Sequence, residues 1–259
     1  MVKAQPVAVD QGMTLVEHLA ELRKRLIISV LAVAVGMIIA FIAYPWIIDF
    51  LLHPYKQLVE SRPESSITGG QLLQTDPLEG FSVRMKTSAY AGIALAMPVL
   101  LWQIWKFVTP GLYDHERRWA VPFVASALLL FVLGAMLAYF TLPRALDFLV
   151  SIAGDDFVSA FQASKYFQLV TYMMLAFGIG FEFPIVLIFL QLAGIVDAGM
   201  LRRARRFAIV GICILVAVIT PSGDPISMLM LSVPMVVFYE AAILVGSFLT
   251  RRRRTEATA

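Results

Sequence analysis

Residues 101–118 read LWQIWKFVTPGLYDHERR and mark a point where one apolar run ends and the next begins. The tryptophans of this stretch are amphipathic aromatics of the kind that gather at a membrane-water boundary, and its Pro-Gly pair breaks a helix. The adjacent Arg117 and Arg118 indicate that this boundary faces the cytoplasm. Glu116 is unusual here, because it places a carboxylate among cations at the membrane surface.

The composition on either side of this stretch is that of a polytopic membrane protein. Of the 259 residues, 59% are hydrophobic and 15% are charged, so the apolar share is well above that of soluble domains. The single cysteine, Cys213, lies inside an apolar run, and the three histidines are scattered along the chain. We therefore expect no disulfide framework, no metal site and no cofactor. Residues 1–13 lack an apolar core, so we expect no cleavable signal peptide.

Working outward, we predict an all-α fold with six transmembrane helices. A capping box that starts at Thr14 begins an amphipathic helix, which continues into the first span. A bilayer requires roughly 20 apolar residues per helix, and the fifth predicted span is short by this measure. The predicted spans cover residues 26–52, 81–108, 119–142, 166–195, 207–220 and 226–249. The predicted regions are a cytoplasmic segment (1–25), the transmembrane domain (26–249) and a basic cytoplasmic tail (250–259).

The distribution of basic residues predicts the orientation of these spans. Four Lys or Arg residues lie in the N-terminal segment, three in 106–118, four in 202–206 and four in 251–254, which makes 15 of the 21 in the chain. Such an excess marks the cytoplasmic side. We therefore expect both termini in the cytoplasm and a location in the cytoplasmic (inner) membrane.

Glu182 lies near the middle of the fourth predicted span, in the stretch 176–184 (AFGIGFEFP). An acidic side chain at a helix centre is unfavourable by about 2.5–3.5 kcal/mol, so it should face protein or water. One interpretation is a polar contact for a partner helix or a proton-linked carboxylate. The structural alternative is a neutral acid that is bonded to a neighbouring span or to the carbonyl freed by Pro184.

Two carboxylates near the cytoplasmic boundary are candidates for recognition of a cation. Glu21 follows Glu17 and precedes Arg25 at helical spacing, so it fits either an ion-pair ladder or a binding site. Glu116 lies next to arginines that would not face it in a helix. A lone carboxylate on a basic surface is a discrete point at which a guanidinium could dock through two parallel hydrogen bonds.

Other charged groups have simpler interpretations. Asp224 is most simply a turn former between the fifth and sixth spans. The arginines of residues 251–254 are a topology signal attracted to anionic headgroups, with an acidic soluble partner as the lesser option. Nucleic acid is not an expected partner, and the chain has no serine-histidine or paired-carboxylate set that would indicate an enzyme.

Six ordered segments carry a resemblance to a known family. They are 18–26 (HLAELRKRL), 98–107 (PVLLWQIWKF), 110–118 (PGLYDHERR), 131–140, 176–184 and 220–224 (TPSGD). On a matching six-span layout, from about residue 13 to 249, the chain resembles the TatC family, the polytopic subunit of the twin-arginine protein translocase.

The resemblance implies a receptor for signal peptides that carry an Arg-Arg pair at the cytoplasmic face. The family assembles with small single-span partners of the TatA and TatB type and passes folded proteins across the bilayer with the proton-motive force. Self-association is also expected from the resemblance.

The resemblance also assigns roles to individual positions. Its signal-binding carboxylates fall on Glu21 and Glu116, and the same region holds Arg23, Gln103 and Phe107. Its polar site for partner helices falls on Glu182 and Thr220, and its functional positions on the far side fall on Pro54 and Asp224.

The chain departs from the family pattern in one region. The turn before the last span reads Thr-Pro-Ser-Gly-Asp where the family often has Thr-Pro-Pro-Asp, and Met228 stands where a glutamine is common. The polar partner site is thereby reduced to Glu182 and Thr220. The main alternative function is a proton-coupled secondary transporter, because broken helices with an intramembrane carboxylate also line solute sites. A membrane enzyme is a third alternative.

Overall fold

The structure is a computed structural model that describes residues 15–61, 71–108, 120–153, 160–192, 194–220 and 223–256. These residues form helices, and one isolated parallel β-bridge joins Leu73 to Gln162. The all-α prediction is confirmed. The helices are α1 (Leu15–Ile42), α2 (Tyr44–Ser61), α3 (Glu79–Val108), α4 (Ala120–Ala153), α5 (Ala163–Gly180), α6 (Phe183–Leu192), α7 (Ala198–Ile219) and α8 (Pro225–Glu256).

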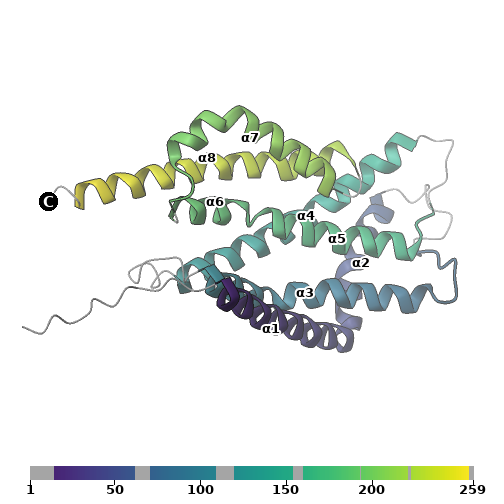
Figure 1. The fold of residues 1–259 in the computed structure, drawn as a ribbon. Coiled ribbons are helices and arrows are strands. Elements are labelled where there is room, and N and C mark those ends of the chain that lie inside the picture. The colour runs from purple at the N-terminus through teal and green to yellow at the C-terminus, as the bar shows by residue number, and fades with distance from the viewer. Residues whose placement is uncertain are drawn as a thin grey trace, which may run out of the picture.

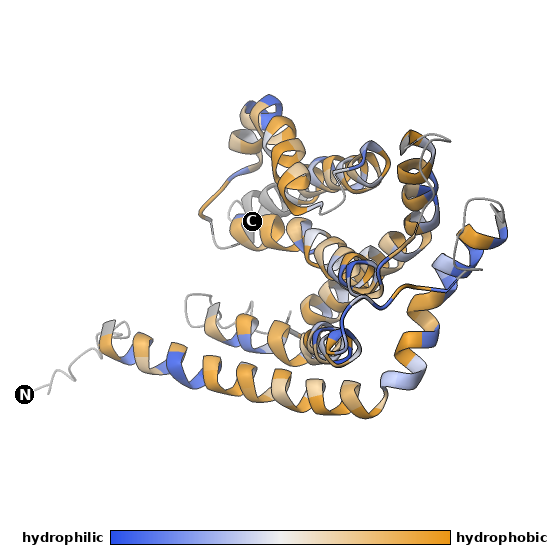
Figure 2. Ribbon diagram, turned by 90° about the vertical axis from the view of Figure 1, so that its right-hand side faces the viewer, coloured by the Kyte–Doolittle hydropathy of each residue, from blue (hydrophilic) through white to orange (hydrophobic). Residues whose placement is uncertain are grey.

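The long helices run side by side along one axis (Figure 1). Helix α1 packs on α3 at one side of the bundle, and the α7–α8 hairpin lies at the other side. Between them, α4 and α5 cross, and α6 continues the line of α5 toward α8. The short helix α2 stands at one end and contacts α4. Apolar residues cover most of the ribbon, as expected for helices that face lipid (Figure 2).

In the described part of the chain, five segments are long and apolar enough to cross a membrane. They are Val16–Ile42, Glu79–Phe107, Val121–Ile152, Ala163–Gln191 and Pro225–Ser247. Helix α7 is 22 residues long but begins with four arginines between positions 202 and 206, so it is not among the five. The six-span count therefore stays a prediction that depends on α7.

Glycines at the helix crossings allow the helices to pack closely. The backbones of Gly36 in α1 and Gly92 in α3 meet so closely that an added Cβ at Gly36 would lie 2.5 Å from the Gly92 carbonyl oxygen. Gly134 of α4 makes a similar approach to the backbone of Phe177 in α5. Phe177 is itself fully buried in the apolar core of the bundle. Small residues at such crossings let two helix backbones approach in lipid.

The first predicted span ends too late. Helix α1 runs unbroken from Leu15 to Ile42, which confirms that the amphipathic N-terminal helix continues into the span. The chain then bends at Ala43 and forms α2, whose residues were assigned partly to the span and partly to a loop. The prediction extended the span through residues 44–52 because this part of α2 is apolar. A short amphipathic helix at the end of a bundle can be as apolar over a few residues as a transmembrane helix.

The fourth predicted span is not one continuous helix. Helix α5 ends at Gly180 and α6 begins at Phe183, with a turn at the two residues between them. The reason is Pro184, which has no N–H to donate to the carbonyl four residues earlier. The N–H of Glu182 instead bonds to the carbonyl of Ile179 at 3.0 Å, which tightens the end of α5. The α5–α6 segment still forms one apolar crossing.

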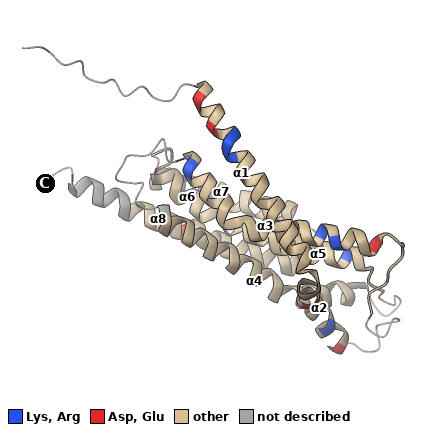
Figure 3. Ribbon diagram, turned by 90° about the horizontal axis from the view of Figure 1, so that it is seen from below, with Lys and Arg blue, Asp and Glu red and all other residues tan. Residues whose placement is uncertain are grey.

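Basic residues outnumber acidic residues at one end of the bundle. The end that holds the beginning of α1, the end of α3, the beginning of α7 and the end of α8 is called the basic end below. Figure 3 shows acidic and basic residues together on the first turns of α1, whereas the middle of the bundle is nearly free of charge. The opposite end holds α2 and the beginnings of α3, α5 and α8.

Candidate functional site

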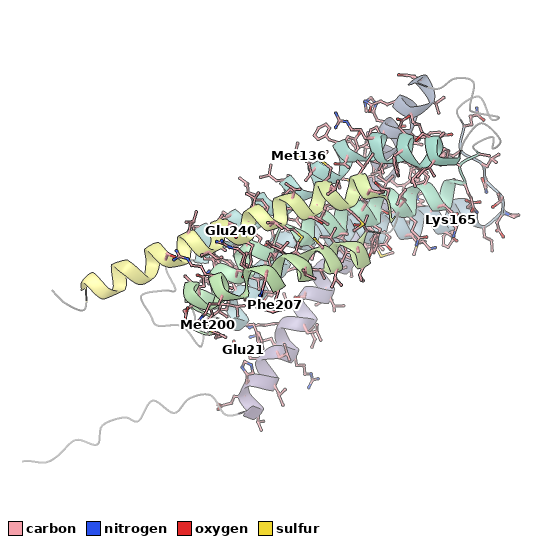
Figure 4. The ribbon with its side chains drawn as sticks, turned by 90° about the horizontal axis from the view of Figure 1, so that it is seen from above. Glu21, Met136, Lys165, Met200, Phe207 and Glu240 are labelled. Carbon is pink, nitrogen blue, oxygen red and sulfur yellow. The ribbon has the colours of Figure 1, made fainter. Side chains whose placement is uncertain are left out.

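The basic end carries Glu21 on the first turns of α1 (Figure 4). Its carboxylate Oε1 accepts a hydrogen bond from Nη2 of Arg25, one turn later on the same helix. The side chains of Glu21 and Arg25 are 21% and 16% exposed, so the pair is more buried than an ordinary surface ion pair. The ion-pair interpretation from sequence is therefore confirmed for these two residues. Oε2 of Glu21 is buried and has no hydrogen-bond partner in the part of the chain that the structure describes.

Glu21 lies level with the end of α3. The rings of His18 and Phe107 lie 4.6 Å apart, and Gly36 meets Gly92 farther along, so α1 and α3 run antiparallel. Glu21, three residues after His18, therefore lies at the level of the turn before Phe107, which carries the half-buried Gln103. The structure thus brings three of the sequence-predicted positions to one end of one helix pair.

Arg23 and Glu116 are the other two residues predicted for this recognition region. Arg23 is exposed and lies on another face of α1 from Glu21. Glu116 lies outside the described residues, as does the rest of the loop from 109 to 119. The convergence of Glu21 and Glu116 therefore stays a prediction.

Glu182 lies at the break between α5 and α6, where it is 9% exposed. Its surroundings are apolar: the ring of Phe181 packs edge-on against Phe238 of α8 at 5.0 Å. Oε1 of Glu182 is buried and accepts no hydrogen bond from any described residue. The structural alternative proposed from the sequence was an acid that is bonded to a neighbouring span. The described residues show no such bond at Oε1.

Thr220 ends α7 and is 4% exposed. Its hydroxyl donates to the carbonyl of Val216 at 2.8 Å, so it is occupied within its own helix. Seven residues later, at the beginning of α8, the hydroxyl of Ser227 lies 4.0 Å from the sulfur of Met173 in α5. Met173 precedes Glu182 by nine residues, which corresponds to about 13 Å of helix. Thr220 and Glu182 therefore lie at different levels of the bundle.

Asp224 has a defined structural role. It is 2% exposed, and its carboxylate accepts the N–H of Ser227 at 2.7 Å, which makes it the N-terminal cap of α8. Pro225 follows at the first helical position, where its missing N–H costs nothing. Gly223 has a φ of +59°, which is a conformation that glycine adopts without a steric penalty. The interpretation as a turn former is thus refined to a helix cap.

Pro54 lies buried inside α2, where the sequence had predicted the end of a span. A proline inside a helix leaves the carbonyl four residues earlier without its usual donor, and that residue is Phe50. The hydroxyl of Tyr139 in α4 donates to this carbonyl at 3.0 Å, and the two rings stack at 4.3 Å. Pro54 thereby creates an acceptor that attaches α2 to α4.

Sequence reasoning missed two polar links between helices. Glu79 at the beginning of α3 accepts the backbone N–H of Thr75 at 2.6 Å and that of Ser164 in α5 at 2.8 Å. At the basic end, Arg205 of α7 forms a two-point ion pair with Glu240 of α8, at 2.7 Å for each bond. The only sequence signal for the link through Glu79 was an acidic residue immediately before an apolar run, which is common at helix starts.

One cavity of about 410 Å³ at the opposite end of the bundle is lined by residues of α2, the beginning of α3 and the beginning of α5. Neither Glu21 nor Glu182 is among its lining residues.

Comparison with known proteins identifies the class. A family model described as Sec-independent protein translocase protein (TatC) matches residues 17–234. The protein of that name from Frankia casuarinae is 41% identical over 247 residues, which cover 94% of this chain and 68% of the relative. The one from Corynebacterium kroppenstedtii is 40% identical over 253 residues; these cover 90% of this chain and 61% of the relative, which is under two thirds of its length.

A solved structure extends the likeness to the fold. The crystal structure of the twin-arginine translocase receptor TatC superposes with a TM-score of 0.76 at 36% identity, over 89% of this chain and 99% of that chain. The family match and the fold therefore define a polytopic helical component of a protein translocase and not an enzyme. The chain belongs to the TatC family.

Proposed function

We propose that this protein is the receptor and core subunit of a twin-arginine translocase, which binds Arg-Arg signal peptides at the basic end of the bundle. The observation that carries the proposal is the half-buried carboxylate of Glu21, whose Oε2 has no described partner, next to the contact between His18 and Phe107. A guanidinium binds two carboxylate oxygens through parallel hydrogen bonds, whereas a lysine ammonium acts as a point charge.

Glu21 and Glu116 would each take one guanidinium of the signal peptide, with Arg23, Gln103 and Phe107 in the same region. Charge-assisted hydrogen bonds contribute roughly 1.5–3 kcal/mol each, so loss of one carboxylate should weaken binding about tenfold or more. The basic end would face the cytoplasm in the inner membrane, because its lysines and arginines favour that side.

The test is binding of a labelled Arg-Arg signal peptide to the purified protein in detergent, next to a Lys-Lys peptide. We expect the wild-type protein to prefer the Arg-Arg peptide, and Glu21→Gln and Glu116→Gln to lose most of that binding. Glu60→Gln is the matched control, because Glu60 is an exposed carboxylate at the opposite end. If both peptides bind equally well, or if the two variants bind like the control, the receptor assignment fails.

The partner site would centre on Glu182 at the α5–α6 break. Its side chain is buried and Oε1 has no partner among the described residues, so a polar group on a partner helix could satisfy it within the bilayer. The partners would be single-span proteins of the TatA and TatB type, with Thr220 as a second contact and with self-association of this chain. Transport of folded cargo would then draw on the proton-motive force.

For this site we predict that Glu182→Ala reduces site-specific crosslinking to a partner helix while Arg-Arg peptide binding is retained. The separation is expected because Glu182 lies inside the bundle, away from the helix ends that hold Glu21. Unchanged crosslinking would leave Glu182 with a structural role only.

Pro54 and Asp224, on the opposite side of the bundle, would act by fixing α2 and α8. Pro54 frees the carbonyl that accepts the hydroxyl of Tyr139, and Asp224 caps α8.

A further inference from the structure

At the basic end, an arginine of the same helix occupies the carboxylate of Glu21. Arg25 lies four residues later on the same face of α1, and this face continues to Gly36 at the contact with α3. The guanidinium of Arg25 binds Oε1 of Glu21 through a single nitrogen, Nη2. The carboxylate is therefore already bound to a guanidinium, the same chemical group that a signal peptide would present.

The internal pair is incomplete. Oε2 of Glu21 and Nε of Arg25 are both buried, and neither has a hydrogen-bond partner in the described ranges. A guanidinium that approached with its full fork would bind both oxygens, which the i, i+4 geometry does not achieve. A better-placed arginine can therefore replace Arg25 with a net gain in hydrogen bonds.

We propose that Arg25 is an internal competitor that occupies the carboxylate of Glu21 in the free protein and that an incoming basic residue of the signal peptide must displace. This inference rests on the proposed function of Glu21. Displacement by a guanidinium exchanges one guanidinium for another and adds the bond to Oε2. Displacement by an ammonium exchanges a guanidinium for a point charge, so it is less favourable. The cost of breaking the Arg25–Glu21 pair is the same in both cases, so Arg25 lowers the affinity for either peptide by the same factor, and the preference for arginine comes from the fork geometry at Glu21.

The test is the binding of fluorescent Arg-Arg and Lys-Lys signal peptides to the full-length protein in detergent, in wild type and Arg25→Gln. We expect Arg25→Gln to bind both peptides about two- to fivefold more tightly, the range of ion pairs of this kind, and to keep the Arg-Arg preference of the wild type. Lys24→Gln is the matched control: it removes the same charge from an exposed neighbouring position.

Two further variants isolate the mechanism. Arg25→Lys keeps the charge but loses the planar fork, so it should tighten peptide binding by less than Arg25→Gln does. In a Glu21→Gln background, Arg25→Gln should change the affinity only as much as Lys24→Gln does, because the carboxylate for which the groups compete is gone. Thermal unfolding of each variant establishes that it is folded.

The outcomes separate this inference from the proposed function. If Arg25→Gln weakens Arg-Arg binding as Glu21→Gln does, Arg25 orients the carboxylate and the displacement proposal is wrong while the receptor function stands. If Arg25→Gln and Lys24→Gln have equal effects, only net charge matters and the proposal is again overturned. If the wild-type protein shows no preference for Arg-Arg, the proposed function fails and this inference falls with it.

Discussion

At the scale of single residues, prolines decide where polar backbone groups become available. Pro54 leaves the carbonyl of Phe50 without its usual donor, and the hydroxyl of Tyr139 takes its place. Pro184 interrupts the helix at the end of α5 and leaves Glu182 in a turn instead of a helix. In lipid, each backbone group that a proline frees must find a partner inside the protein. Pro54 therefore has a consequence in another helix, α4.

The link between Pro54 and Tyr139 predicts a coupled pair of substitutions. Tyr139→Phe should lower the free energy of unfolding by about 1–3 kcal/mol, because the Phe50 carbonyl loses its donor. In a Pro54→Ala background the N–H of residue 54 can bond to that carbonyl, so the same change should cost less. Thermal unfolding in detergent of the wild type, both single variants and the double variant measures this coupling. Additive effects would show that the two residues act independently.

At the scale of elements, the crossing of α1 and α3 holds the candidate site together. Both helices end at the site, with His18 and Phe107 in ring contact. Their separation is set at Gly36 and Gly92, where backbone meets backbone. A change at this crossing should therefore be felt at Glu21, although the glycines are several turns away.

We predict that Gly36→Ala destabilises the protein, because the new Cβ would lie 2.5 Å from the Gly92 carbonyl oxygen and one helix must move. Overpacking of this kind typically costs about 1–3 kcal/mol. Gly211→Ala is the control, since an added Cβ there meets nothing within 4 Å. The midpoint of thermal unfolding and Arg-Arg peptide binding should both decrease for Gly36→Ala only. Equal behaviour of the two variants would mean that α1 can shift without cost.

At the scale of the whole molecule, the open question is whether α7 crosses the membrane. Its first turns hold the arginines, and its later residues are apolar and exposed toward the surroundings of the bundle. Arg205 pairs with Glu240 of α8 at the basic end, which places the beginning of α7 level with the later part of α8. This arrangement favours a hairpin in which both helices cross, and hence six spans.

Cysteine labelling in cells tests this arrangement in a Cys213→Ser background. An impermeant maleimide should label Lys165→Cys from outside, because Lys165 is exposed at the end opposite Glu21 (Figure 4). Met200→Cys, at the beginning of α7, and Ala257→Cys, after α8, should both be labelled only after the membrane is opened. If only α8 crosses, these two positions will lie on opposite sides.

The sequence by itself determined the fold class, the approximate positions of most spans and the location of several candidate residues. Apolar runs of sufficient length, capping residues and basic clusters are local signals, and a membrane converts them directly into helices and orientation. Glu21 and Glu182 were found in this way, because a carboxylate beside or inside a bilayer is chemically out of place.

Only the tertiary structure decided what those residues contact. The separate helix α2, the break before Glu182, the Tyr139 bond to Phe50 and the placement of Gln103 level with Glu21 all depend on which helices lie side by side. The sequence allowed Glu21 to be either paired or free, and the structure shows it paired with Arg25 through one oxygen. Local spacing places two side chains on one helix face, but packing against a second helix decides how deeply they are buried and which of their atoms stay unpaired.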